Sequence, residues 1–273
     1  MTTPRGSGER CSRFWFQCAE ISALAQEQCS ALCALLRNGT LTGMSTAEGA
    51  RARARTEVTA AIKDEARRQL AAEGASKLSL RAVARELGMV SSALYRYFPS
   101  RDDLLTALII DAYDAIGAAA ETAHAAVPEG ELMRRWTVAC EAVRVWALAH
   151  PHEYALIYGS PVPGYAAPAT TISSAARVAM VLIGVVRDAD RGPGLTGLAL
   201  PAELRTEAER MAADIAPELP VEAAPAMVAA WAELFGLVGF EVFGQFEQVV
   251  LDRERFFRHA VTRLGVSVGL PAA

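Results

Sequence analysis

The chain has 273 residues, of which 52% are hydrophobic, and its formal net charge is −4. A chain of this length can bury a sizeable core and can hold two domains. Its five cysteines are an odd number, and the four before residue 44 have no histidine among them. This pattern disfavours a disulfide framework and a zinc site, so we expect no metal and no cofactor. Long periodic segments rich in alanine predict an all-α fold.

The charge is unevenly distributed along the chain. Residues 44–110 contain 11 basic and 8 acidic side chains, whereas residues 111–273 contain 12 basic and 20 acidic ones. A mildly basic end on an acidic body fits a protein that places one end on nucleic acid.

Residues 1–43 lack the charged start and continuous apolar core of a secretory signal. Met44 would make an ordinary start for the domain that follows. We therefore expect residues 1–43 to be an extension, either disordered or weakly helical, or to arise from an incorrectly assigned start codon. A regulatory or partner-binding helix is the alternative.

Three arginines, Arg51, Arg53 and Arg55, alternate just ahead of a predicted helix over residues 56–73. Such an arm can reach DNA phosphates or lie in the minor groove. It can equally be a solvated, frayed helix end, and the sequence leaves both roles open.

Residues 78–101 show the pattern of two short helices joined by a tight turn. The first has apolar residues at i, i+3, i+4 and i+7, namely Leu80, Val83, Ala84 and Leu87. Gly88 can then adopt the left-handed conformation that ends a helix, and Ser91 or Ser92 can cap the next one. The pattern predicts a helix-turn-helix with the second helix, residues 91–98, as the reader of DNA.

The run "LSLRAVARELGMVSSALYRYFPSRDDLL" resembles the N-terminal domain of the TetR/AcrR family of bacterial transcriptional repressors, and the likeness covers roughly residues 52–111. The resemblance implies a three-helix DNA-binding domain over residues 44–110. It also implies a helical ligand-binding and dimerisation domain over residues 111–273. Such a protein is a cytoplasmic homodimer that represses transcription from a palindromic DNA operator and is released by a small-molecule effector, here expected to be apolar.

The resemblance also assigns DNA contacts. The expected residues are Ser79, Arg81, Ser91, Ser92, Ala93, Tyr95, Arg96, Tyr97 and Arg101. The first three residues of the reader helix would face base edges, while the two tyrosine hydroxyls and Arg101 would face phosphates. Ser79 and Arg81 are further phosphate candidates. Two alternatives stay open: Tyr97 can pack against the C-terminal domain, and Arg96 can be a solvated charge.

Beyond the reader helix the chain is expected to be helical throughout. Ser100 and Asp103 form a capping box for a long helix, which in the family joins the two domains and carries the allosteric signal by its tilt. Further helices are expected over residues 131–150, 201–216 and 225–251, with a strongly apolar helix over residues 169–186 and a final helix at the C-terminus. Glu233 and Glu241 interrupt the apolar run of the 225–251 helix, which argues against a membrane span.

The last two helices are the expected dimer surface. Three glycines lie within the 225–251 segment, where each costs about 1 kcal/mol relative to alanine unless close helix packing requires it. The predicted interface residues are Trp231, Gly236, Gly239 and Gly244. The segment also resembles a subgroup of the family with a Trp-x-x-x-His-Gly signature, but Phe235 occupies the histidine position, so no histidine role carries over.

Ligand binding is expected in the C-terminal domain, whose aromatic side chains can line an apolar cavity. The candidate residues are Trp136, Trp146, Tyr154, Tyr158, Phe235 and Glu241. Aromatic residues at helical spacing can instead belong to the core, and Glu241 can pair across the dimer rather than anchor a ligand.

Two other functional classes compete with a DNA-binding regulator. His150, His152 and Glu153 are close in sequence and could do acid–base or metal chemistry. No second cluster, glycine-rich phosphate loop or nucleophile elbow accompanies them, so we do not expect an enzyme. A helical adaptor that binds only protein is the other alternative.

Overall fold

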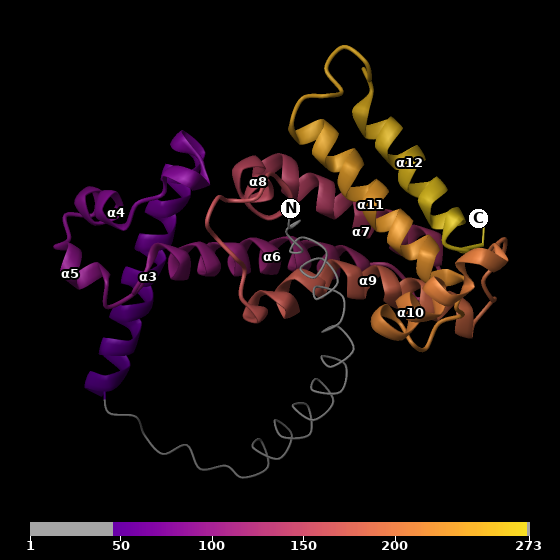
Figure 1. The fold of residues 1–273 in the computed structure, drawn as a ribbon, viewed down its shortest axis with the longest axis horizontal. Helices are drawn as coiled ribbons and strands as arrows, with labels where there is room; N and C mark the ends of the chain where they lie inside the picture. Colours follow the sequence, from indigo (N-terminus) through magenta and orange to yellow (C-terminus); the bar gives the residue numbers. More distant parts are fainter. Residues whose placement is uncertain (1–45, 272–273) are drawn as a thin grey trace, which may run out of the picture. The chain divides into compact units, whose positions relative to one another are not determined.

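The computed structural model describes residues 46–271 and confirms the all-α fold, with no strand in that range. The order of elements follows the chain (Figure 1). The α-helices are α3 (Thr46–Glu73), α4 (Leu80–Glu86), α5 (Ser91–Leu94), α6 (Arg101–Ala125), α7 (Leu132–Ala149), α8 (Pro151–Tyr158), α9 (Ile172–Arg191), α10 (Arg205–Ile215), α11 (Ala223–Val242) and α12 (Arg253–Ser267). Short 3₁₀ turns occur at Ala75–Lys77, Ala169–Thr171 and Ala202–Leu204. The prediction for residues 1–43 concerns a segment outside the described residues.

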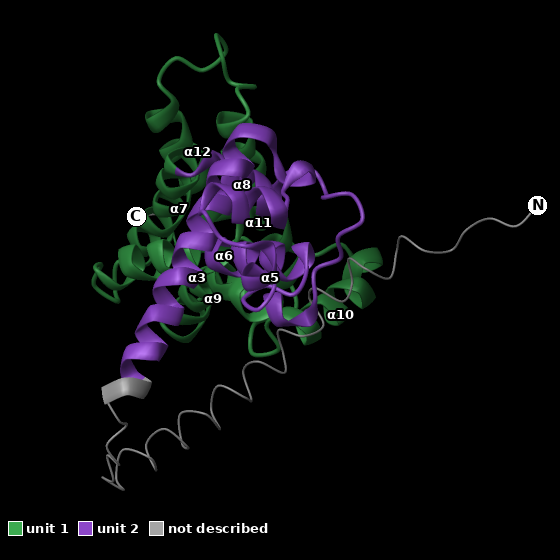
Figure 2. Ribbon diagram, turned by 90° about the vertical axis from the view of Figure 1, so that its left-hand side faces the viewer, with its two compact units in different colours: residues 1–25, 113–149, 172–273 green, residues 26–112, 150–171 purple. Residues whose placement is uncertain are grey.

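The described chain forms two compact units, which Figure 2 shows in different colours. We call residues 46–112 and 150–171 the head unit, and residues 113–149 and 172–271 the body unit. The head unit therefore includes α8 and the loop after it, a segment that follows a body helix in sequence. Helix α6 contributes its residues up to Ala112 to the head unit and its later residues to the body unit.

The core of the head unit is built from the apolar stripes of its helices. Three residues of α4 from the predicted stripe, Leu80, Val83 and Ala84, are buried, and Leu87 packs at the edge. They meet buried residues of α3, α5 and α6, which are Ile62, Ala66, Leu70, Leu94, Leu104, Leu105 and Leu108. The helical spacing read from the sequence thus gives the correct buried face.

The turn after α4 ends that helix by two backbone hydrogen bonds. Gly88 has a φ of 63°, its N–H donates to Arg85 O at 3.1 Å, and the N–H of Met89 donates to Ala84 O at 2.8 Å. This pair of bonds is the Schellman motif, which needs a left-handed residue and so favours glycine. Gly88 thereby turns the chain sharply from α4 toward α5.

An ion-pair network ties α8 into the head unit. Arg67 on α3 donates to Glu153 on α8 at 3.0 Å and to Asp111 on α6 at 2.6 Å. Lys63 pairs with the same Asp111 at 2.8 Å. All of these side chains are partly buried, so the pairs are less screened than pairs on an open surface.

The loop after α8 adds apolar and polar contacts to the same unit. Leu156, Val162 and Tyr165 pack against the head core, and the Tyr165 hydroxyl lies 2.9 Å from the Thr106 hydroxyl. The segment 150–171 is thus a structural part of the head unit, although residues 113–149 of the body unit separate it in sequence from the rest of that unit.

In the body unit, α9 is the most buried helix and packs along α7. Helices α7, α11 and α12 are joined by Arg144, which donates two hydrogen bonds of 2.6 Å to Glu241 and lies over the Phe257 ring at 5.5 Å. The Trp136 indole N–H donates to Val261 O at 2.9 Å. These contacts satisfy the buried polar groups of Glu241 and Trp136 inside an apolar core.

The body part of α6 is fastened to α9 by Arg177. Its guanidinium pairs with Glu121 at 2.6 and 2.8 Å and with Asp114 at 3.0 Å. A Cβ at Gly117 would lie 2.6 Å from the Arg177 Cβ, so only glycine fits where the two helices cross.

Two described segments, Ala169–Arg191 and Ala223–Val242, are long and apolar enough to cross a membrane. Core helices of folded proteins share this property, and 61% of the apolar window of the first is buried, against 33% for the second. Length and composition here are weak evidence for a membrane span.

His124, near the end of α6, has an unusual partner. Its Nε2 lies 2.7 Å from Nη2 of Arg135, a buried guanidinium that also pairs with Asp188 at 2.7 Å. Because arginine only donates, this nitrogen of His124 must accept and the ring must be neutral. Partial burial, reinforced by the Arg135 charge, lowers the pKa of His124 below its usual value, and Asp188 opposes the shift.

A pH dependence of stability follows from this arrangement. The unfolded chain takes up the His124 proton at a higher pH than the folded chain does. The free energy of unfolding should therefore fall as the pH drops below about 6.5. In His124→Gln, an uncharged acceptor remains beside Arg135, and this component should vanish. Urea unfolding of both proteins between about pH 7.5 and pH 5 measures the difference, because this range spans the ordinary pKa of histidine. Parallel pH profiles for the two proteins would contradict the assignment.

Candidate DNA-binding surface

The reader helix α5 is one turn long and is anchored by its apolar side. Leu94 is fully buried and Phe98, just beyond the helix, is 7% exposed. Ser91 and Ser92 are exposed and Ala93 is half-buried. The predicted serine cap is wrong: Val90 occupies the cap position and no side chain caps the helix. Both serines therefore lie in the first turn with exposed side chains, the place from which a reader helix contacts base edges.

A shallow, open cavity of about 430 Å³ lies beside α5. Its lining residues are Leu78, Ser79, Leu80, Arg81, Tyr95, Pro99, Ser100 and Arg101. Four of the predicted phosphate contacts, Ser79, Arg81, Tyr95 and Arg101, thus surround one hollow. Hydroxyl and guanidinium groups are the donors that DNA phosphates accept hydrogen bonds from.

Arg101 binds backbone carbonyls that the sequence alone did not indicate. Its guanidinium donates to the carbonyls of Ala75 at 2.8 Å, Ser76 at 3.2 Å and Leu78 at 3.1 Å. These carbonyls belong to the 3₁₀ turn that leads into α4. Arg101 therefore joins the start of α6 to the residues just before α4 and braces this turn, and its predicted contact with a DNA phosphate stays a prediction.

Tyr97 is half-buried and packs against the core of the head unit itself. The Arg55 guanidinium carbon lies 5.2 Å from the centroid of the Tyr97 ring. Tyr95 is 41% exposed and Arg96 is also exposed. The two tyrosines of the reader segment therefore differ: one is open to solvent and the other supports a neighbouring helix.

Comparison with known proteins matches both halves of the chain. The model of the tetR family of bacterial regulatory proteins matches residues 62–108, and that of the tetracyclin repressor-like C-terminal domain matches residues 136–264. The HTH-type transcriptional regulator Rv1816 of Mycobacterium tuberculosis is 37% identical over 230 residues, which cover 81% of this chain and 95% of the relative. The regulator Mb1846 of Mycobacterium bovis matches equally well.

The chain belongs to the TetR family.

Solved structures agree with this membership. The crystal structure of the protein SCO4313 has 34% sequence identity and a TM-score of 0.64, with 78% of this chain and 97% of that chain covered. The TetR-family regulator PfmR of Thermus thermophilus has 18% identity and a TM-score of 0.50, covers 74% and 96% of the two chains, and supports the fold alone. The predicted family and fold class are confirmed, and the relatives are transcriptional regulators.

In this TetR-family chain the six predicted ligand residues are divided between the two units. Tyr154 and Tyr158 lie in the head unit with their ring centroids 5.2 Å apart, whereas Trp136, Trp146, Phe235 and Glu241 lie in the body unit. Glu241 is buried and is bound by Arg144 of the same chain. Its partner is therefore an internal arginine, which sequence reasoning missed because the two residues are 97 positions apart.

A small apolar cavity of about 10 Å³ lies in the body unit. Its lining residues are Trp136, Ala179, Leu182, Ile183, Ile215, Met227, Val228 and Trp231. Trp136 was a predicted ligand residue, and Trp231, predicted for the dimer surface, also packs on Phe235 with ring centroids 4.5 Å apart.

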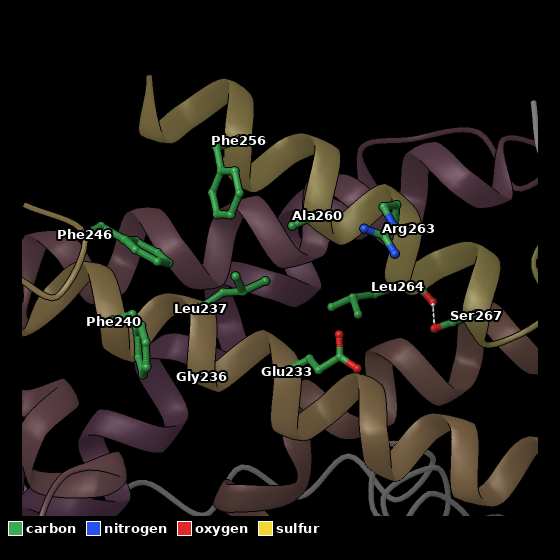
Figure 3. Close-up of a pocket in the computed structure, with 10 residues that line it drawn as sticks. All are labelled: Glu233, Gly236, Leu237, Phe240, Phe246, Phe256, Ala260, Arg263, Leu264 and Ser267. Atoms are coloured by element: carbon green, nitrogen blue, oxygen red, sulfur yellow. Dashed lines mark hydrogen bonds between the residues drawn. The ribbon is translucent and has the colours of Figure 1, made fainter. Parts of the chain in front are cut away.

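A groove of about 510 Å³ separates α11 from α12 (Figure 3). Its lining residues are Glu233, Gly236, Leu237, Phe240, Phe246, Phe256, Ala260, Arg263, Leu264 and Ser267. Of the four predicted interface residues, only Gly236 lines it. The signal in the sequence was the three- and four-residue spacing of Phe256, Ala260, Arg263 and Ser267 along one face of α12.

Gly244 does not lie within a helix, so its predicted role in close helix packing is wrong. Helix α11 ends at Val242, and Gly244 follows it with a φ of 80°. Its N–H donates to Glu241 O at 3.2 Å, and the N–H of Gln245 donates to Phe240 O at 2.8 Å. Gly244 therefore terminates α11 in the same manner as Gly88 terminates α4.

The histidine cluster that suggested an enzyme is partly engaged in structure. The Glu153 carboxylate pairs with Arg67, and His150 immediately precedes α8 at its cap position. Within the described residues no group of three or more His, Cys, Asp or Glu side chains is placed to hold a metal ion.

Arg101→Ala tests the bracing role of this residue. Removing a charged donor from three carbonyls, in a side chain that is about one-third exposed, should lower the free energy of unfolding by about 1–2 kcal/mol. Urea unfolding measures this loss. The alternative is that Arg101 contacts the DNA backbone. In that case Arg101→Ala would leave the stability unchanged and reduce the slope of log K against log salt by about 0.9, the value for one phosphate.

Proposed function

We propose that this chain is a cytoplasmic, homodimeric transcriptional repressor that binds a palindromic operator and is released by a small apolar ligand. The observation that carries the proposal is the reader helix α5, whose N-terminal residues are exposed while Leu94 anchors it to the head core. Membership of the TetR family and relatives that are helix-turn-helix regulators support DNA as the partner.

The proposed contacts with DNA divide into two groups. Ser91, Ser92 and Ala93 face base edges from the first turn of α5. A backbone phosphate fits the hollow beside α5, where the Tyr95 hydroxyl and Arg81 are both exposed at its rim. Phosphate contacts fix the register of the helix, and the few base contacts select the sequence.

A reader helix of one turn reaches few base pairs, so specificity requires two heads on one operator. The groove between α11 and α12 supports self-association. Phe240 at its edge is 55% exposed and Phe256 is 39% exposed, and Phe246 packs between them at 5.7 and 5.6 Å. An aromatic patch of this kind gains stability when a second apolar surface covers it.

Charge at the rim of the groove fits a second copy of the same chain. Glu233 lies on the α11 side and Arg263 on the α12 side, both exposed, and neither forms an ion pair with another described residue (Figure 3). A self-complementary interface can use a surface that presents both signs of charge, because each copy offers the partner that the other needs.

The proposed effector is apolar because the cavity beside Trp136 is lined entirely by apolar side chains. Its volume of about 10 Å³ corresponds to about one water molecule, so an effector has to enlarge it. The unbranched, flexible side chain of Met227 is the lining group best suited to move. Trp136 also binds Val261 of α12, which connects the cavity to the helix that lines the groove.

A titration with DNA tests the proposal. The probe is a fluorescent duplex spanning the gene's own upstream region, and binding is followed by anisotropy in the presence of excess unrelated duplex. We expect tight binding by the wild type. Phe240→Glu places a charge in the groove and should give a monomer in analytical ultracentrifugation that binds this duplex at least about tenfold more weakly, since each head then binds alone.

Val145→Glu is the matched control, because Val145 is 62% exposed on α7 and does not line the groove. This variant should remain dimeric and bind DNA as the wild type does. A wild type that shows no preference for its upstream duplex over the competitor would favour a protein-binding adaptor instead. A Phe240→Glu variant that remains dimeric would reject the groove as the interface.

A further inference from the structure

Arg55 and Tyr97 join the first helix of the head unit to the reader segment. The Arg55 guanidinium lies 5.2 Å from the Tyr97 ring centroid, within the range of a cation–π contact. Arg55 is exposed and forms no ion pair with any carboxylate of the described chain, whereas Tyr97 packs against the head core. The basic end of this pair is therefore open, and the aromatic end is fixed.

The three arginines ahead of the predicted helix start lie inside a helix. Helix α3 begins at Thr46, so Arg51, Arg53 and Arg55 occupy its first turns. Residues four apart share a face of a helix, while residues two apart point about 200° apart around its axis. Arg51 and Arg55 thus lie on one face, and Arg53 lies on a different one.

We propose that Arg55 binds a backbone phosphate of the operator and that Tyr97 is the positioning residue that orients its guanidinium. The inference rests on the proposed DNA-binding function. It replaces the phosphate contact expected for the Tyr97 hydroxyl with a contact made by the arginine stacked on its ring. Tyr97 lies only two residues beyond Tyr95 in the reader segment, so the guanidinium is next to the element that faces DNA.

The chemistry favours arginine in this position. A guanidinium that stacks on a ring leaves its N–H groups directed outward in the plane, where they match two oxygens of a phosphate. Stacking also restricts a long side chain before DNA arrives, which reduces the conformational entropy lost on binding. A fixed ring beneath a cation without a carboxylate partner is the arrangement that such preorganisation requires.

The measurable consequence is the salt dependence of DNA binding. Each phosphate neutralised by a cation adds about 0.9 to the magnitude of the slope of log K against log salt for B-form DNA. Arg55→Gln should therefore reduce this magnitude by about 0.9 for the upstream duplex. Arg53→Gln, which removes the same charge from another face of α3, should leave the slope within about 0.3 of the wild-type value.

Substitutions of Tyr97 separate its ring from its hydroxyl. Tyr97→Phe keeps the ring and should bind as the wild type does. Tyr97→Leu removes the ring and should weaken binding about threefold to tenfold, the size of a cation–π contact between an exposed and a partly buried site. In an Arg55→Gln background the same Tyr97→Leu change should cost nothing further, because the group that it positions is absent.

Each contrary result identifies what fails. If Tyr97→Phe weakens binding as much as Tyr97→Leu, the hydroxyl binds phosphate directly and the positioning role is wrong. If Arg55→Gln leaves the slope at the wild-type value, Arg55 is a solvated charge, and if both arginine variants lower it equally, the effect is not specific to the arginine stacked on Tyr97. If Tyr97→Leu also weakens binding in the Arg55→Gln background, its effect is on the fold of the head.

A wild type that fails to bind the upstream duplex contradicts the proposed function itself, whereas wild-type binding with an unaltered Arg55→Gln slope contradicts this inference alone.

Discussion

A helix of four residues has no stability of its own in water, because one turn fixes several dihedral angles for a single hydrogen bond. The reader helix α5 is of this length, so its position depends on burial of Leu94 and Phe98 in the head core. Three features of the surrounding structure hold α5 in this position. Gly88 ends α4 so that α5 can follow at once, Arg101 braces the turn that precedes α4, and α3 supplies the opposite wall of the core.

Helix α6 forms ion pairs with residues of both units. Among the described helices, α6 alone contributes residues to both units. Asp111 pairs with Lys63 and Arg67 in the head unit, and Asp114, less than one turn later, pairs with Arg177 in the body unit. Carboxylates less than one turn apart on α6 thus bind partners in different units.

The sequence predicted those features that depend on local chemistry. The spacing of Leu80, Val83 and Ala84 gave the buried face of α4, and Gly88 gave its end, because both follow from helix geometry and from a single left-handed residue. The Ser100–Asp103 capping pair was also readable, and the Ser100 hydroxyl accepts from Asp103 N–H at 3.1 Å.

Features that depend on distant partners could not be read in this way. Arg101 looked like a surface cation until the carbonyls of the turn before α4 were placed around it. Glu241 looked like a site for a ligand because its partner Arg144 lies on another helix. The end of α11 was predicted near residue 251, since the apolar pattern continues through a loop whose break is marked only by Gly244.

The central claim is that two copies of one short reader helix act together on a single piece of DNA. Hydroxyl-radical footprinting of the gene's upstream region with the purified protein tests this claim most directly. We expect two protected segments that are related by symmetry and centred one helical turn apart, or a multiple of it, at roughly 10–10.5 base pairs per turn. A single asymmetric protected segment, or none, would contradict it.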